Sequence, residues 1–294
     1  MAFELTALFF AVISPALWAI MNVLDKFVVS HKIKNPLSFG FIAGTINLLI
    51  GTVIALFVSW REVTPKDIAF SAISGILLGI NFYFWYILIK EEDASNLVGL
   101  IYFYPVIIAI LSYFFLNEQL HLLSYFGMCL TLFGAVMLSI NATKIKIKAG
   151  AWMIASLILI TAFYEFFIKV ATINLPAVNG VAVSSVFLGI ACIPMLISSK
   201  TRKGLKETAK YAGWAVLNES FTFLGVFTTY FAMAKLPATI VSSIAATQPL
   251  AVLIIEKIFS RGGIKVERAP ELLPKLIPIA SIVLGIMLLY LPEL

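Results

Sequence analysis

Charged residues are scarce in this sequence. Asp, Glu, Lys and Arg make up 12% of the 294 residues, whereas hydrophobic residues make up 61%. An average soluble domain carries about 25% charged residues. A soluble chain of this composition would aggregate, so the composition predicts a membrane protein. The net charge of +6 belongs to basic residues in the links between apolar segments and does not indicate nucleic-acid binding.

Cysteine and histidine are also rare. Cys129 and Cys192 lie in apolar runs, and we interpret them as buried small hydrophobic residues without a disulfide or a metal. His31 and His121 both lie in links. The sequence contains no HExxH, GxSxG, P-loop or CxxC motif. We therefore expect no enzyme activity, no cofactor and no ATP-driven transport by this chain.

Long apolar stretches dominate instead. A transmembrane helix needs about 20 apolar residues. The first stretch has no basic segment before it and no small-residue cleavage site, so we expect it to be a retained span rather than a signal peptide. Ten spans fit the sequence, at residues 4–30, 37–59, 67–90, 94–116, 122–141, 150–172, 179–199, 211–234, 238–259 and 274–293. The predicted fold is an all-α membrane protein of ten transmembrane helices.

The segment 104–138 forms a predicted helical hairpin. Pro105 opens its first helix, Asn117-Glu118 ends that helix, and Gly127 and Gly134 lie on its second helix at small-xxx-small-like spacing. This hairpin resembles the signature of the EamA branch of the drug/metabolite transporter superfamily, in which Gly usually stands at the position of Asn117. We interpret Glu118 as a capping or gate acid more than as a ligand.

An internal repeat divides the chain into halves at 1–143 and 144–294. Ala94-Ser95 precedes Pro105 as Ala238-Thr239 precedes Pro249, LFGAVML at 132–138 recurs as VLGIMLL at 283–289, and Lys26 corresponds to Lys169. Arg261-Gly262-Gly263 replaces the acidic tip in the second half. Because five spans is an odd number, we expect two inverted five-helix repeats, an arrangement typical of secondary transporters.

The links carry an uneven charge. Sixteen of the 21 Lys and Arg residues fall on one predicted face and three on the other. The positive-inside rule places the basic face in the cytoplasm and both termini outside. The family resemblance implies the reverse, with both termini inside, so the orientation stays open.

Polar residues inside the spans are the candidate binding residues, because a charge at the centre of a membrane helix costs about 2.5–3.5 kcal/mol. Glu165 lies about 23 Å into its span, at about 1.5 Å per residue, and Lys169 follows one turn later. The pair serves substrate recognition or is a structural ion pair. Asp25 and Lys26 lie near a span end and are expected to reach toward water. The predicted substrate-binding residues are Trp18, Asn22, Asn81, Trp85, Tyr102, Glu165, Lys169, Glu219 and Thr222.

The resemblance implies a secondary transporter of small organic metabolites, and an exporter, in the plasma or inner membrane of a prokaryote. The intramembrane acids favour an amino-acid-like, zwitterionic or cationic substrate. A phosphate carrier would need arginine, and every arginine lies in a link. Protons are a candidate coupling ion, and the sequence leaves monomer and homodimer open. The alternatives are a lipid or head-group flippase component and a non-transporting membrane scaffold.

Overall fold

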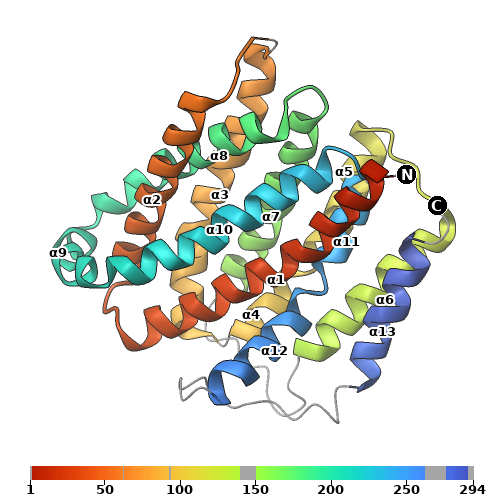
Figure 1. Ribbon diagram of the computed structural model, residues 1–294. Helices are drawn as coiled ribbons and strands as arrows, with labels where there is room; N and C mark the ends of the chain where they lie inside the picture. The colour runs from red at the N-terminus through yellow and green to blue at the C-terminus, as the bar shows by residue number, and fades with distance from the viewer. Residues whose placement is uncertain (1, 62, 93, 140–149, 262–275, 291–294) are drawn as a thin grey trace.

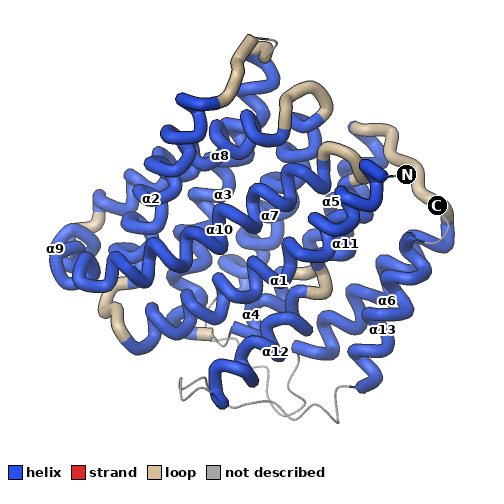
Figure 2. Tube along the Cα trace, viewed as in Figure 1, coloured by secondary structure: helices blue, strands red, loops and turns tan. Residues whose placement is uncertain are grey.

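The computed structural model describes residues 2–290, except 62, 93, 140–149 and 262–275. Helices account for almost all of this part of the chain, and Figure 2 shows helices and loops but no strand in it. The α-helices are α1 (Ala2–His31), α2 (Pro36–Phe57), α3 (Pro65–Glu91), α4 (Ala94–Ile101), α5 (Tyr104–Phe115), α6 (Leu122–Ser139), α7 (Ala151–Thr172), α8 (Ala177–Cys192), α9 (Ser199–Thr208), α10 (Ala212–Met233), α11 (Ala238–Ala245), α12 (Gln248–Arg261) and α13 (Leu276–Tyr290). Short 3₁₀ helices cover Ile193–Ile197 and Ala209–Tyr211.

Seven helical segments are long and apolar enough to cross a membrane. They are Leu5–His31, Pro36–Phe57, Pro65–Glu91, Leu97–Phe115, Ala151–Thr172, Ala177–Ile197 and Ala238–Ser260. Leu122–Leu138 and Leu276–Leu289 are shorter apolar helices. The continuous 22-residue helix α10 is less apolar, because it contains the polar residues Asn218, Glu219 and Ser220. Together these helices confirm the prediction of an all-α membrane protein of about ten helices.

Two of the helices begin at sequence signals that can be recognised in advance. The Asn35 side chain accepts a hydrogen bond from the Leu37 amide at 3.0 Å, and the Thr64 hydroxyl accepts one from the Asp67 amide at 3.3 Å. Each cap is followed by a proline, whose fixed φ and missing N–H suit the first helical position. These caps fix the starts of α2 and α3.

Two of the predicted spans are broken helices. The predicted span 94–116 divides into α4 and α5, and the predicted span 238–259 divides into α11 and α12. Pro105 and Pro249 are the second residues of α5 and α12, where proline is tolerated. Proline has no backbone N–H to donate to the preceding turn. The earlier helix therefore ends a few residues before each proline. Both breaks occur at corresponding places of the two halves.

Small residues bring helices from opposite halves close together. A Cβ atom added to Gly127 of α6 would lie 2.5 Å from the Leu289 backbone nitrogen of α13, and one added to Gly134 would lie 2.6 Å from the Pro278 carbonyl oxygen. Figure 1 shows α6 and α13 side by side at the edge of the bundle. Gly44 makes a comparable approach to Cys192, so α2 packs against α8 in the same way.

Three sequence predictions need correction or lie outside the described residues. Residues 199–208, predicted as a basic link, form α9 because Ser198 caps a helix there. Cys129 is exposed on α6 rather than buried, whereas Cys192 is buried as expected. The basic residues of 144–148 and the tip at 262–263 lie outside the described part of the chain.

Lys34, Lys90 and the basic helix α9 lie at one end of the bundle. The Lys90 ammonium donates to the Ile33 carbonyl at 3.0 Å, and the Lys34 ammonium lies 3.2 Å from the Glu207 carboxylate of α9. The Ser38 hydroxyl donates to the Thr201 carbonyl at 2.9 Å. The α2, α3 and α9 ends therefore share a face, and the side of the membrane that this face occupies stays a prediction.

Candidate functional site

A cavity of about 790 Å³, part of it open to solvent, lies between the two halves of the chain. Its walls come from α1, α3, α4, α5, α7, α10, α11 and α12, and from Tyr102 in the α4–α5 link. Both helix breaks border it, through Tyr102 and Tyr104 on one side and Gln248 on the other. A site at broken helices between two repeats is the usual location of a substrate pocket in secondary transporters.

Six of the nine predicted binding residues line this cavity. They are Trp18, Asn22, Asn81, Trp85, Tyr102 and Glu165. They come from four different parts of the chain, so the structure brings together residues that the sequence separates by up to 147 positions. Their role in binding stays a prediction.

Glu165 is the one Asp, Glu, Lys, Arg or His residue among the described residues that line the cavity. Its side chain comes from the middle of α7 and is 9% exposed. Within the described part of the chain, no hydrogen-bond partner is found for its buried Oε2 atom or for the neighbouring Tyr164 hydroxyl. An acceptor and a hydroxyl that are buried without partners in a cavity are available to a ligand.

Aromatic rings and amides make up much of the remaining wall. Trp18, Trp85, Tyr102 and Tyr104 contribute rings, and the Tyr102 and Tyr104 ring centroids are 5.5 Å apart. The Asn81 amide donates to the Thr161 hydroxyl at 2.8 Å, and Thr161 lies one turn before Glu165 on α7. The Tyr102 hydroxyl donates to the Gln248 side chain, which joins the two helix breaks. These bonds hold the wall around Glu165 in place.

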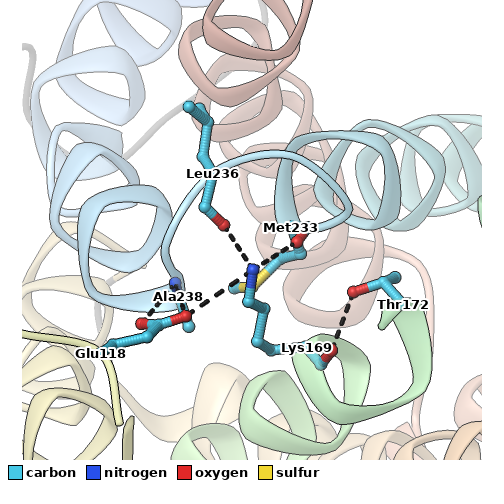
Figure 3. Close-up of polar contacts among 6 residues, drawn as sticks. All are labelled: Glu118, Lys169, Thr172, Met233, Leu236 and Ala238. Carbon is cyan, nitrogen blue, oxygen red and sulfur yellow. Dashed lines mark hydrogen bonds and ion pairs between the residues drawn. The ribbon is translucent and has the colours of Figure 1, made fainter. Parts of the chain in front are cut away.

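Lys169 does not pair with Glu165, although the sequence spacing predicted that it would. Its ammonium lies 3.6 Å from Glu118 Oε1 and donates to the Met233 and Leu236 carbonyls at 2.9 and 2.8 Å (Figure 3). Its side chain therefore turns away from the cavity toward the end of α10. Tertiary contacts override the i, i+4 pairing here.

Glu118 joins Lys169 to the start of α11. Its two carboxylate oxygens accept the Ala238 backbone N–H at 3.1 and 2.9 Å (Figure 3). A carboxylate at a helix N-terminus satisfies an otherwise unpaired amide and interacts favourably with the helix dipole. Glu118 is thus placed as a capping acid, and we call the contacts among Glu118, Lys169, Met233, Leu236 and Ala238 the Lys169 latch.

Glu219 and Thr222 also lie outside the cavity wall. Glu219 is fully buried, and its carboxylate accepts hydrogen bonds from the amides of Asn47 and Asn218 at 2.6 and 3.1 Å. The Thr222 hydroxyl donates back to the Asn218 carbonyl on its own helix at 3.4 Å. Helix α10 therefore turns Glu219 toward α2.

Sequence reasoning missed several wall residues. Tyr104, Tyr164, Thr229 and Gln248 line the cavity but were not among the predicted binding residues. For Tyr104 and Gln248 the available signal was the proline that follows each of them, because broken membrane helices expose polar groups to a cavity. Tyr164 and Thr229 carried no such signal. Asp25, expected to reach toward water, is fully buried instead.

Comparisons with known proteins agree with this architecture. Residues 5–140 match the sequence model of the EamA-like transporter family. An "Uncharacterized transporter" of Archaeoglobus fulgidus is 24% identical over 125 residues, which cover 42% of this chain and 43% of the relative. The matched part thus spans less than half of that relative. A solved structure titled "Crystal structure of protein" aligns over 98% of both chains with a TM-score of 0.69 and 16% identity, which shows a shared fold.

Proposed function

We propose that this protein, whose residues 5–140 match the EamA-like transporter family, is a secondary transporter of small organic metabolites. Its substrates are amino-acid-like, zwitterionic or cationic, and it moves them by alternating access. The observation that carries this proposal is Glu165, a buried carboxylate in an aromatic cavity between the halves, with one oxygen that has no hydrogen-bond partner among the described residues. A positively charged group is the natural complement of that carboxylate.

The cavity chemistry favours an ammonium group over a phosphate. Among the described lining residues there is no Lys, Arg or His, so an anionic substrate would meet Glu165 without a compensating cation. The faces of Trp18, Trp85 and Tyr102 can stabilise a cation by about 0.5–2 kcal/mol per favourable contact. Asn22 and Asn81 supply amides for a polar substituent such as a carboxylate.

Two similar lysine contacts provide candidate closures for the cavity. The Lys26 ammonium donates to the Ile89 and Glu92 carbonyls at 3.2 and 2.8 Å, as Lys169 does to the Met233 and Leu236 carbonyls. The accepting residues in the two halves are related by the same shift that relates Pro105 to Pro249. This correspondence supports the proposed pair of inverted repeats, with one closure at each end of the cavity.

We further propose export across the cell membrane of a prokaryote, coupled to protons. The basic end of the bundle, at α9, is assigned to the cytoplasm on the positive-inside rule. Glu165 can hold either a proton or the cationic group of a substrate, because both need the same carboxylate. Exchange of the two at Glu165 would couple substrate movement to proton movement.

A ligand screen followed by a flux assay tests this function. A ligand present at a hundred times its dissociation constant stabilises the purified protein by about 2.7 kcal/mol, which a thermal-shift screen of amines and amino acids detects. We expect Glu165→Gln to remain folded but to bind a selected ligand at least about tenfold more weakly, and its proteoliposome flux to lose its dependence on pH. Gln has the shape of Glu without its charge.

Asp67→Asn is the matched control. Asp67 is a buried acid at the start of α3, outside the cavity wall, and Asn can take over its role near the helix start. The control should keep both affinity and pH profile. Unchanged binding and an unchanged pH profile in Glu165→Gln would contradict the proposed role of the cavity acid.

A further inference from the structure

A second buried polar cluster lies beside the cavity. It consists of Asp25 on α1, Asn47 on α2, Trp85 and Tyr86 on α3, and Asn218 and Glu219 on α10, and we call it the Asp25–Glu219 cluster. The side chains of Asp25 and Glu219 are both fully buried. The cluster is distinct from the Glu165 site, because only Trp85 belongs to both.

One amide joins the two carboxylates. Asn218 Nδ2 donates to Asp25 Oδ1 at 2.9 Å and to Glu219 Oε1 at 3.1 Å. Trp85 Nε1 donates to Asp25 Oδ2 at 2.7 Å, and Asn47 Nδ2 donates to Glu219 Oε2 at 2.6 Å. The two acids are therefore neighbours that share a hydrogen-bond donor in a region without solvent.

Within the described part of the chain, this pair has no basic residue to balance its charge. Among the described residues, no ion pair joins Asp25 or Glu219 to Lys, Arg or His. Lys26 follows Asp25 in the chain, but its ammonium donates to the Ile89 and Glu92 carbonyls instead. The other ionisable neighbours are Tyr86 and Cys192, which bring no positive charge. Buried charges are normally paired or coordinate a metal ion.

Two further oxygens of the cluster have no hydrogen-bond donor in the part of the chain that the structure describes. Asn47 is 1% exposed and Asn218 is fully buried, yet within the described residues neither Oδ1 atom has a partner. Each of these amides is held in the cluster by its nitrogen, which donates to a carboxylate there. The cluster therefore combines two carboxylates with two amide oxygens that have no hydrogen-bond partner among the described residues.

We propose that the Asp25–Glu219 cluster is a binding site for a Na⁺ ion. Carboxylate and amide oxygens are the ligands that hard cations prefer. A single proton would satisfy one acceptor, whereas a metal ion is coordinated by several oxygens at once and can engage both amides together with the acids. The donors from Trp85, Asn47 and Asn218 already offset part of the carboxylate charge, so one positive charge suffices.

The position of the cluster connects this ion to the substrate cavity. Trp85 lines the cavity with its ring and donates its indole N–H to Asp25. Helices α1, α3 and α10 all contribute to both the cluster and the cavity wall. An ion that draws these helices together would change the cavity. This consequence rests on the proposed transport function, but the ion site itself does not.

Equilibrium binding of ²²Na⁺ to the purified full-length protein tests the site. The assay is made in a potassium phosphate buffer without any organic cation or substrate, so its outcome is independent of the flux assay on Glu165. We expect saturable binding of one ion per chain. Asp25→Asn and Glu219→Gln should each weaken it at least about tenfold, because each removes one of the two negative charges.

Two additional variants separate ion binding from folding. Asn47→Ala removes one amide oxygen, leaves both acids in place and should also lower the affinity for Na⁺. Asp67→Asn removes a different buried acid of the bundle, about 27 Å along α3 from Trp85 at about 1.5 Å per residue, and should leave Na⁺ binding unchanged. Size-exclusion chromatography checks that each variant is monodisperse.

Several results would overturn the proposal. Folded wild-type protein without saturable Na⁺ binding would show that the cluster is not a Na⁺ site. Displacement of ²²Na⁺ by equal concentrations of Ca²⁺ or Mg²⁺ would indicate a divalent-cation site. Undiminished binding in folded Asp25→Asn, Glu219→Gln and Asn47→Ala would place the ion elsewhere.

Discussion

Asn117 shows how one backbone position explains a departure from a family pattern. Its φ of 53° lies in the left-handed region, which glycine adopts readily and asparagine tolerates better than most residues. It ends α5 and lets the Glu118 amide donate to the Ser112 carbonyl at 3.1 Å. Asn can therefore stand where the hairpin signature has Gly, because both residues permit the turn that delivers Glu118 to α11.

We predict that Asn117→Val destabilises the protein by about 1–2 kcal/mol, the usual cost of left-handed backbone for a residue with a Cβ atom. Thermal unfolding in detergent measures the change. Asn117→Gly is the control and should be at least as stable as the wild type. Equal unfolding temperatures of Asn117→Val and Asn117→Gly would contradict this prediction, because the turn would then tolerate a β-branched residue.

The residues around Glu165 show where sequence reasoning succeeds and where it ends. Glu165 could be selected because a carboxylate in the middle of an apolar span is costly without a function. The predicted ion pair between Glu165 and Lys169 was wrong, because the Lys169 ammonium donates to the carbonyls of Met233 and Leu236 instead. Those carbonyls lie more than sixty residues after Lys169 in the sequence, so a local pattern of residues cannot predict the contact.

At the scale of helices, apolar length predicted most boundaries to within a few residues. The predicted span 150–172 became α7 at Ala151–Thr172, and the predicted span 211–234 became α10 at Ala212–Met233. The breaks after α4 and α11 were not predicted, although Pro105 and Pro249 were noted, because a membrane proline can either kink a helix or end it. Packing against neighbouring helices decides between these outcomes.

Close helix packing at Gly285 gives a prediction at the same scale. A Cβ atom added there would lie 2.3 Å from the Thr131 hydroxyl and 2.6 Å from the Thr131 backbone nitrogen of α6. Because that backbone cannot move aside alone, Gly285→Ala should separate α6 from α13 and cost about 1–3 kcal/mol. The expected result is a melting temperature of purified Gly285→Ala below that of the wild type.

Gly213 on α10 is the matched control for this packing prediction. No described atom lies within 4 Å of a Cβ atom added there, apart from its own chain neighbourhood. Gly213→Ala should leave the melting temperature unchanged or raise it slightly, since Ala favours helix over Gly by about 0.8–1.0 kcal/mol. Equal destabilisation by both substitutions would contradict close packing as the cause.

At the scale of the whole molecule, the two lysine contacts lie at opposite ends of the bundle. Lys26 contacts the end of α3, next to Lys90 and the basic face at α9. Lys169 contacts Glu118 in the α5–α6 link, which lies far from α9 (Figure 1). The sequence paired the two lysines by their position in the predicted repeat, and that pairing stays a prediction. Their carbonyl partners became visible only in the folded molecule, since backbone acceptors carry no sequence signal.

This arrangement predicts that Lys26→Met and Lys169→Met shift the protein in opposite directions. Each substitution removes two charge-assisted hydrogen bonds from one closure, and such bonds contribute about 1.5–3 kcal/mol each.

A cysteine at Thr161 in the cavity, with Cys129→Ser and Cys192→Ala elsewhere, reports access to a membrane-impermeant maleimide from either side of oriented vesicles. The measured quantity is the ratio of the labelling rates from the two sides of the membrane. Lys169→Met should change this ratio about tenfold in favour of the side of the Lys169 latch. Lys26→Met should change it about tenfold in favour of the side of α9. Lys66→Met, at the exposed start of α3, is the control and should leave that ratio unchanged. If both variants shift the ratio toward the same side, the two lysines are not opposing closures of one cavity, and the alternating-access proposal fails at this point.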